Sequence, residues 1–555
     1  MPPVIYKSPY PSCTLPSTSI FTFLFSGHHD HSRTAYIDVL TKRTLTRAQV
    51  RLMALQLGHG ARKDLRLEKS EVALVFSPNS IAWPVVLLGL VAAGGIATLA
   101  NSGYTSSELA HQYKDSGARL LFVHPTLLTI ARAMFESLGF SKQDADTRII
   151  IMDLDIHSAD GLRGVKSLIG GGALDAEEQY GGERAHETAV ICYSSGTTGR
   201  PKGVETTHHN LSSDLVIFNA VSGWDAQDSF IAALPFFHVY GLNLLLFNPF
   251  YLGAPVAIVP RFVPDIYFAA LAEHRITRAL IVPPIALAFA HHPAVEKHDL
   301  RSLRLILSGA APLSAELLAI LNKRFMKIGA DVTITQGYGM TELSTISHFV
   351  NETDARAGKA FTIGHLLPNL EARLVVSDED TTVDAKKPGE RGELWIRGPI
   401  VMKRYLRNEK ATRETTTMDG WLKTGDVATV DEEGRFTIVD RKKELIKYKG
   451  FQVSPAELED VLLGHPEIID AAVIGIPAPD HSGNELPSAY IVRAPRSTSA
   501  PDDFAKYVAS RIANHKQLRG GVVLVDAIPK SASGKILRRK LKELAQLVQP
   551  GAAKL

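Results

Sequence analysis

The chain has 555 residues, of which 45% are hydrophobic and 21% charged, and it carries a net charge of +3. At roughly 150 residues per domain, this length predicts three or four folding units with an ample core. The composition excludes a disordered chain, and the small net charge does not point to a nucleic-acid partner. Two cysteines exclude a disulfide framework and any cysteine-rich zinc module.

The first 350 residues alternate apolar, strand-like runs with helix-like segments. Alternation of this kind predicts βαβ units and mainly parallel sheets, here in two stacked layers. The strand-like runs are residues 72–76, 120–123, 149–152, 279–282 and 303–307. We therefore expect an α/β fold for this part of the chain.

The most apolar stretch, residues 83–100, predicts a helix, a glycine turn and a buried strand. Pro84 and the pair Gly94-Gly95 interrupt the stretch, and it is shorter than the ~20 residues that cross a bilayer. The aromatic run 20–25 is too brief for a signal peptide and predicts a first helix. We therefore expect no membrane span.

A loop rich in glycine and hydroxyl residues follows the apolar run 189–193. Its sequence over residues 194–204 is Ser-Ser-Gly-Thr-Thr-Gly-Arg-Pro-Lys-Gly-Val. Glycines let backbone N–H groups approach phosphate oxygens, hydroxyls add donors, and Lys202 adds charge, so this pattern predicts a triphosphate cradle. It is not a Walker A loop, because Arg200 and Pro201 separate Gly199 from Lys202. Taken alone, the same composition would also suit a flexible surface loop.

Beyond residue 350 the pattern changes twice. Residues 360–440 contain shorter strands and turns, which predict a small β-rich subdomain. A charged break, Asp440-Arg-Lys-Lys-Glu444, follows it. The remaining hundred or so residues form an αβ block that is large enough for an independent lobe.

Seven motifs in order resemble the adenylate-forming family, which includes acyl- and aryl-CoA ligases. Within that family the whole chain is most similar to the 4-coumarate–CoA ligases and to fungal peroxisomal phenylacetate–CoA ligases. The motifs are the loop at 194–204, LPFFHVYG at 234–241, SGAAPLS at 308–314, QGYGMTE at 336–342, GWLKTGD at 420–426, DRKKELIKYKGFQV at 440–453 and PKSASGKILRR at 529–539.

The resemblance implies a large N-terminal AMP-binding domain, residues 1–439, and a small mobile α+β domain, residues 444–555. A hinge at 440–443 would join them. The large domain would contain two stacked α/β subdomains, about 30–230 and 231–355, and a β-rich subdomain, about 356–439.

The resemblance also implies the residues that bind ATP. Gln336, Gly337 and Tyr338 would line the adenine, Thr341 would touch the α-phosphate, and Asp426 would accept hydrogen bonds from both ribose hydroxyls. The full set of expected ATP- or AMP-binding residues is Ser194, Ser195, Gly196, Thr197, Thr198, Gly199, Lys202, Gln336, Gly337, Tyr338, Thr341, Asp426, Arg441, Lys443, Lys447 and Gln452.

The expected catalytic residues are Lys535, His238, Thr341 and Glu342. In the family, a lysine like Lys535 enters the adenylation site when the small domain closes, where its charge stabilises the developing charge at the α-phosphate. His238 resembles an aromatic gate residue. Glu342, with Thr198, would hold Mg²⁺. Without the other motifs, Lys535 would count as one member of a solvated basic run.

Acyl-pocket and CoA residues follow from the same comparison. The acyl substrate would contact His238, Tyr240, Leu244, Gly309, Ala310 and Gly337. CoA would pass Arg261, Lys449 and Gly450, and Lys443 would be the pivot of the small domain.

These residues predict an ATP-dependent acid–CoA ligase for an aryl, arylalkyl or medium-chain carboxylic acid. An acyl-AMP would form with release of pyrophosphate, and CoA would then take the acyl group. One alternative is transfer to a carrier-protein thiol or an amine, and another is a nucleotide-binding regulator without turnover. The terminal Ala553-Lys554-Leu555 resembles the peroxisomal address read by the import receptor, and an ordinary frayed tail is the alternative.

Overall fold

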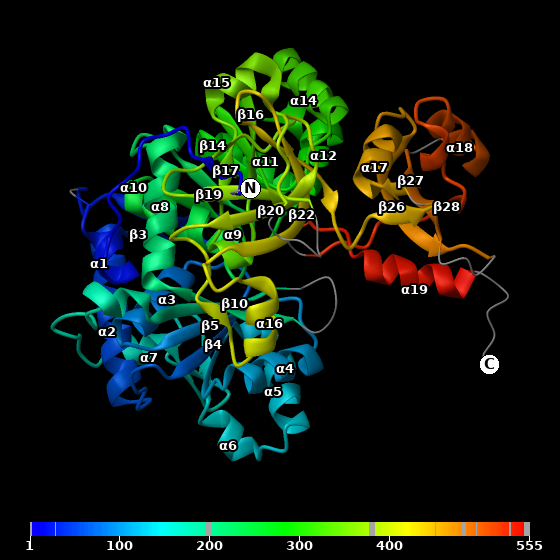
Figure 1. Cartoon of the computed structure of the whole chain (residues 1–555). Coiled ribbons are helices and arrows are strands. Elements are labelled where there is room, and N and C mark those ends of the chain that lie inside the picture. Colours follow the sequence, from blue (N-terminus) through cyan, green and yellow to red (C-terminus); the bar gives the residue numbers. More distant parts are fainter. Residues whose placement is uncertain are drawn as a thin grey trace.

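The molecule consists of a large body and a smaller C-terminal lobe that stands beside it (Figure 1). The computed structural model describes residues 3–27, 29–194, 201–376, 383–449, 451–479, 484–494, 497–531 and 534–548. Residues 195–200 of the predicted phosphate loop, Gly450 and the tripeptide 553–555 lie outside these ranges. Within them, no helix is both long and apolar enough to cross a bilayer.

The first sheet of the body carries the strand that leads into the phosphate loop. Among the described residues it has nine strands in the order β21-β11-β10-β5-β4-β6-β7-β9-β8. The chain enters the loop from β10, which lies parallel to β5, and returns antiparallel along β11. The strands are β4 Val72–Phe76, β5 Ile96–Ala100, β6 Leu120–Val123, β7 Ile149–Ile151, β8 Ser158–Ala159, β9 Leu162–Gly164, β10 Thr188–Ser194, β11 Lys202–Thr207 and β21 Arg404–Tyr405.

The second sheet carries the strands that end at the candidate site. In the described part of the chain it also has nine strands, in the order β18-β17-β16-β15-β14-β12-β13-β2-β3. Strands β14, β15 and β16 are parallel neighbours, so their carboxyl ends share one edge. The strands are β2 Thr34–Asp38, β3 Thr44–Thr46, β12 Phe230–Ala232, β13 Val256–Ile258, β14 Arg278–Ile281, β15 Leu305–Ser308, β16 Thr333–Tyr338, β17 His348–Phe349 and β18 His365–Leu366.

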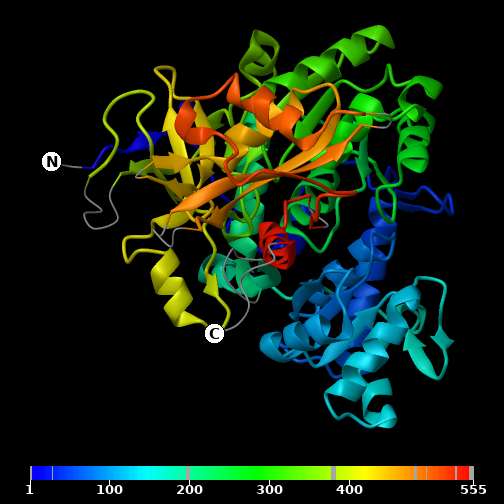
Figure 2. The same cartoon turned by 90° about the vertical axis from the view of Figure 1, so that its right-hand side faces the viewer.

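Two smaller parts complete the fold. A third sheet of the body has the order β1-β19-β20-β22-β23, formed by β1 Tyr6–Lys7, β19 Glu371–Val375, β20 Gly392–Arg397, β22 Leu422–Val430 and β23 Phe436–Arg441. The lobe contains the hairpin β24 Ile446–Tyr448 and β25 Phe451–Val453, the sheet β26 Ile468–Pro477, β27 Glu485–Arg493 and β28 Val522–Leu524, and helices α17 Pro455–Leu463, α18 Pro501–Ala509 and α19 Arg538–Val548. Figure 2 shows the lobe lying across one face of the body.

Helix α3, Trp83–Ala92, explains why the two large sheets stack. All ten of its residues are buried, because the sequence is apolar around the whole helix. One continuous apolar core contains α3 together with residues of both sheets. The other main helices of the body are α1 Ile20–Phe25, α2 Arg47–Lys63, α4 Ser106–Ser116, α5 Leu128–Ser137, α6 Lys142–Asp146, α7 Val165–Ile169, α8 His208–Ser222, α10 Asn248–Leu252, α11 Pro264–Glu273, α12 Pro283–His291, α13 Ala294–Lys297, α14 Ala315–Lys327 and α16 Glu409–Thr415.

The predicted α/β fold with a separate small lobe is confirmed, but the sheets do not follow the expected boundaries everywhere. Residues 34–46, expected in the first α/β subdomain, pair with β13 in the second sheet. The N-terminal strand β1 pairs with β19 of the β-rich sheet. Strand β23 extends through Arg441, so the first two residues of the segment 440–443 belong to a strand. Pairing partners distant in sequence decide these memberships, and local pattern does not reveal them.

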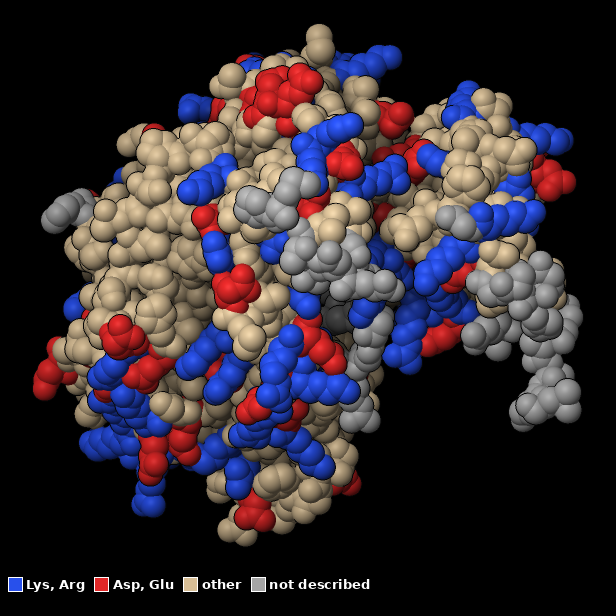
Figure 3. Space-filling model, viewed as in Figure 1, with Lys and Arg blue, Asp and Glu red and all other residues tan. Residues whose placement is uncertain are grey.

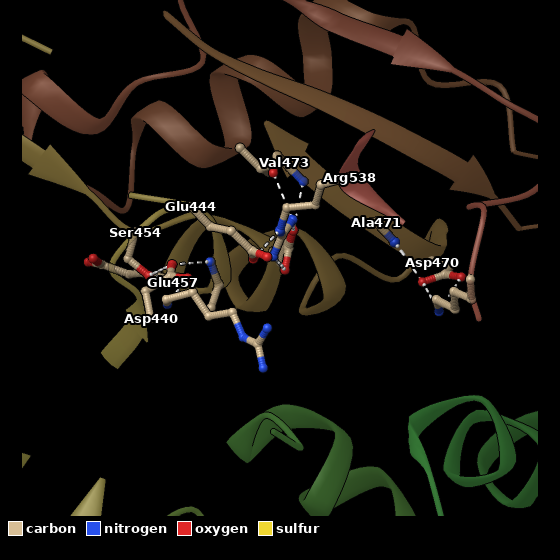
Figure 4. A network of polar contacts seen from close by, with 12 residues as sticks. Asp440, Glu444, Ser454, Glu457, Asp470, Ala471, Val473 and Arg538 are labelled. Carbon is tan, nitrogen blue, oxygen red and sulfur yellow. Dashed lines mark hydrogen bonds and ion pairs between the residues drawn. The ribbon is translucent and has the colours of Figure 1, made fainter. Parts of the chain in front are cut away.

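A buried polar network lies where the lobe follows β23 (Figure 4). The guanidinium of Arg538 donates to Glu444, to Glu459 and to the carbonyl of Val473. Ser454 caps α17 and donates to Asp440 at 2.6 Å. These contacts link the first and last segments of the lobe to each other and to the end of β23.

Candidate active site

A cavity opens at the carboxyl ends of β15 and β16. Ligands in open α/β sheets bind at such strand ends. Nine of the predicted site residues line it: His238, Tyr240, Leu244, Gly309, Ala310, Gly337, Tyr338, Thr341 and Lys535. The other lining residues, which the sequence analysis did not assign to the site, are Val239, Leu307, Gly339, Met340, Thr345 and Ile346.

Close backbone packing shapes the apolar side of this cavity. The hydroxyl of Tyr240 donates to the carbonyl of Leu307 at 3.0 Å, which fixes its ring over Gly309. At Gly339, a Cβ atom would lie 1.7 Å from the carbonyl oxygen of Thr345, so only glycine fits there. The cavity wall is therefore set by backbone as much as by side chains.

The predicted ribose acid, Asp426, is joined to two other predicted residues. The Tyr338 hydroxyl donates to its carboxylate at 2.5 Å, and Arg441 Nε lies 3.2 Å from it. Asp426 and Arg441 face each other across the β22–β23 pair. Burial raises the pKa of Asp426, and the Arg441 charge opposes that shift. The Asp426 carboxylate therefore links Tyr338 of the second sheet to Arg441 of the β-rich sheet.

Lys535 reaches this site from the lobe. It follows Gly534, whose φ of +82° suits glycine, and its N–H donates to the Ser531 hydroxyl at 3.1 Å. Burial lowers the pKa of the Lys535 ammonium, Arg441 lowers it further, and Asp426 and Glu342 raise it. The structure therefore brings the predicted catalytic lysine among the predicted nucleotide residues.

His238 lies at the boundary between the apolar and the charged sides of the cavity. It begins the turn before the π-helix Leu242–Phe247, and its Nδ1 accepts from the Tyr240 N–H at 3.2 Å. Burial, and then the Lys535 charge, lower its pKa to about 3. The imidazole is therefore neutral at physiological pH.

Tyr405 connects the two flanks of the phosphate region, and the sequence analysis missed it. Strand β21 pairs with β11, which places the Tyr405 ring 4.1 Å from the Lys202 ammonium. Its hydroxyl donates to the Glu342 carboxylate at 2.8 Å. A lone tyrosine in a charged segment gives no local signal for this role.

Several predicted residues lie away from the cavity lining. Gln336 is buried, and its side-chain amide accepts from the Leu313 N–H at 2.7 Å and donates to the Ala360 carbonyl. It therefore holds the 308–314 loop rather than presenting a free amide. Five others are exposed at the surface: Arg261, Lys443, Lys447, Lys449 and Gln452. Of the predicted loop, Ser194 and Lys202 are described and Ser195, Gly196, Thr197, Thr198 and Gly199 are not.

The described residues contain no group of three or more His, Cys, Asp or Glu side chains that could enclose a metal ion. The carboxylate of Glu342 is nevertheless a hard oxygen ligand, and it is close enough to act electrostatically on Lys535. Mg²⁺ in nucleotide sites commonly takes one or two carboxylates, and substrate phosphates and water supply the rest. Glu342 fits that mode of binding.

Comparison with known proteins agrees with this geometry. Residues 26–406 match the model of the AMP-binding enzyme family, and residues 457–535 match that of the AMP-binding enzyme C-terminal domain. Peroxisomal OPC-8:0-CoA ligase 1 of Arabidopsis thaliana is 36% identical over 97% of this chain and 95% of its own length. The probable CoA ligase CCL5 of Humulus lupulus is 38% identical over 95% of this chain and 93% of its own length.

Solved structures extend the likeness to three dimensions. The anthranilate CoA ligase AuaEII in complex with anthranoyl-AMP superimposes with a TM-score of 0.84 at 27% identity, over 96% of this chain and 98% of that one. A benzoate CoA ligase from Burkholderia xenovorans LB400 superimposes with a TM-score of 0.81 at 27% identity, over 94% of this chain and 99% of that one. With both family models matched in order and relatives aligned over nearly its whole length, this chain belongs to the AMP-binding enzyme family.

Proposed function

We propose that this protein activates an aryl, arylalkyl or medium-chain carboxylic acid in the cavity between Tyr240 and Lys535. The enzyme is an acid–CoA ligase that works through an acyl-adenylate. In the first step a carboxylate oxygen attacks the α-phosphorus of ATP, and pyrophosphate leaves. In the second step the CoA thiol attacks the acyl carbon, and AMP leaves.

One observation supports the acid class. The cavity is apolar where Leu244, Leu307 and Ile346 line it and is charged at Lys535. An apolar pocket with a few placed polar groups binds the body of an organic acid by burial and its carboxylate by charge. No cationic side chain other than Lys535 lines the described cavity wall, so a second carboxylate on the substrate would have no cationic partner there.

The residues around the cavity suit the first step. Lys535 would stabilise the charge that develops between the carboxylate and the α-phosphate, because a cation in a water-poor site acts strongly. Asp426 would accept hydrogen bonds from the ribose hydroxyls, and Thr341 would donate to the α-phosphate. Mg²⁺, held by Glu342 and by Thr198 of the predicted loop, would neutralise phosphate charge when bound.

Lys and Arg side chains also gather where the lobe faces the body, near α19 (Figure 3). A positive field beside a cleft raises the local concentration of anions such as ATP and CoA. This arrangement supports nucleotide entry at the junction of body and lobe.

The second step would require the lobe to rotate about residues 440–443. Rotation would withdraw Lys535 and present Lys447 and Gln452 to the intermediate, with Lys443 at the pivot and Arg261, Lys449 and Gly450 along the CoA path. In the present arrangement the hairpin β24–β25 pairs Lys447 with Gln452 at the surface. Gating of this kind allows one pocket to serve two acceptors.

Product analysis tests this function. Purified protein with ATP, CoA and a panel of aryl, arylalkyl and medium-chain acids should release AMP and acyl-CoA. Acid-dependent pyrophosphate release without acyl-CoA would favour a carrier-protein thiol or an amine as the acceptor. No acid-dependent pyrophosphate release would refute adenylation and leave the regulator hypothesis.

We also propose import into peroxisomes through Ala553-Lys554-Leu555. One relative is named as a peroxisomal ligase. A fluorescent fusion that keeps the C-terminus free should enter peroxisomes, and removal of the tripeptide should leave it outside.

A further inference from the structure

A buried carboxylate lies behind the acyl cavity, outside the residues that line it. Asp214, on helix α8, has no exposed surface. Burying a carboxylate is costly unless hydrogen bonds compensate for the lost water, and its loss of solvent raises the pKa of Asp214 to about 7. The contacts of this buried acid indicate what it does.

The first contact of Asp214 is with the wall that carries Leu244. The Asn243 side-chain amide donates to Asp214 Oδ2 at 2.7 Å. Asn243 belongs to the π-helix Leu242–Phe247, and its neighbour Leu244 lines the cavity. Single π-turns are rare, and they are frequent at functional sites. Asp214 therefore holds the element that directs Leu244 into the cavity.

The second contact is with the wall that carries Ile346. The backbone N–H of Ile346 donates to Asp214 Oδ1 at 3.2 Å. The preceding residues are irregular, since Ser344 has a φ of +56° and the Thr345 N–H bonds to the carbonyl of Leu343. Backbone groups in irregular segments need partners outside regular structure. Here the partner is a side chain of α8.

Ile346 is a sensitive position in the cavity. Its Cδ1 lies so close to Gly337 that a Cβ atom there would approach it to 2.7 Å. Thr345 and Ile346 both line the cavity. A small shift of this segment would change the space available to the acyl group.

We propose that Asp214 is a positioning residue that determines acid specificity, because its two carboxylate oxygens hold two separate walls of the acyl cavity in register. The carboxylate acts through Leu244 and Ile346 and does not touch the substrate. This inference rests on the proposed function, since it assumes that the cavity holds the acid.

The acid selectivity of Asp214→Ala tests whether the Asp214 carboxylate, called the clamp below, holds the two cavity walls in place. Acid-dependent pyrophosphate release is measured for octanoate and phenylacetate, which differ in length and shape, and the ratio of their kcat/KM values is compared with wild type. We expect this ratio to change by about tenfold, since pocket contacts of methylene size give discrimination of that order. The KM for ATP should stay within about twofold of wild type.

Three further variants separate positioning from general damage. Asn243→Ala removes one arm of the clamp and should shift the ratio in the same direction by less. Asp214→Asn keeps an oxygen for the Ile346 N–H and should also shift it less. Ser212→Ala is the matched control, because Ser212 is equally buried on α8 and its hydroxyl bonds to the carbonyl of His208 in its own helix; it should leave the ratio unchanged.

If Asp214→Ala lowered kcat/KM by the same factor for both acids, the proposal would be overturned. A rise in the KM for ATP as large as the change in the acid ratio would also overturn it. If Asp214→Ala does not fold, Asn243→Ala decides, and an unchanged ratio in that variant refutes the clamp. Pyrophosphate release reports adenylation alone. A changed ratio of kcat/KM values without acyl-CoA formation would therefore support the positioning role of Asp214 and would reject CoA as the acceptor.

Discussion

Lys535 and His238 line the same cavity, although one comes from the C-terminal lobe and the other from the body. The lysine charge adds to burial in lowering the pKa of His238 to about 3. The lobe is therefore docked with its lysine inserted, and the imidazole beside it is neutral. This is the arrangement in which the first half-reaction would take place.

Lys535→Ala should slow adenylation by about 10²- to 10³-fold and spare the thioester step. The lysine charge would be needed only when charge develops at the α-phosphate, and loss of one such electrostatic contact costs about 10²- to 10³-fold in kcat. Pyrophosphate release would measure the first step, and acyl-CoA formation from supplied acyl-AMP the second. Lys540→Ala, an exposed lysine of α19, is the control and should behave as wild type. Equal loss of both steps in Lys535→Ala would refute the assigned role.

Short strands and motif residues are the features that the sequence predicted well. Strands β4 and β6 have the predicted bounds, residues 72–76 and 120–123, because apolar runs of four or five residues between turns have the length of a strand and are too short for most helices. The placement of Asp426 and Arg441 together, and of Lys535 in the cavity, also agrees with the motif analysis.

Features that depend on partners distant in sequence were not predictable. Tyr405 meets Glu342 only because β21 pairs with β11, and Gln336 bonds to Leu313 only because two loops meet. Asp214 lies within a helix whose neighbours include other polar residues, so its pattern does not distinguish it from a surface acid. Side-chain partners across the fold give these residues their roles, and a single sequence contains no periodic signal for such contacts.

Arg538→Ala should destabilise the lobe, and Arg539→Ala should not. The Arg538 side chain is 14% exposed and bonds to Glu444, Glu459 and Val473 (Figure 4). Its removal leaves the buried Glu459 carboxylate without its cationic partner, at a cost of about 3 to 5 kcal/mol. The Arg539 side chain is 80% exposed and pairs with Glu543, so its loss should cost less than about 1 kcal/mol. Thermal unfolding with limited proteolysis of the lobe compares them, and equal midpoints would contradict the prediction.

Leu244→Ala should enlarge the acyl cavity and favour longer acids. Leu244 is fully buried and lines the cavity, so truncation should cost about 2 to 5 kcal/mol of stability while adding room for the substrate. Leu245→Ala is the matched control: it lies in the same π-helix, is equally buried and is outside the cavity lining. Comparing kcat/KM for decanoate and hexanoate in both variants measures the effect. A similar change of the ratio in both would rule out a direct effect of cavity size.

Asp214→Asn should change how stability depends on pH. Burial raises the pKa of Asp214 in the folded protein to about 7 from an ordinary value near 3.8, so the folded state binds this proton more tightly than the unfolded state. The stabilising contribution of the protonated acid is complete below pH 3.8 and is lost as the pH rises towards 7. Asparagine does not titrate, and the Asn243 and Ile346 groups that bond to Asp214 are neutral. The thermal midpoint of Asp214→Asn relative to wild type should therefore be higher at pH 8 than at pH 5. A difference that stays constant across this range, as expected for Ser212→Ala, would show that Asp214 does not titrate there.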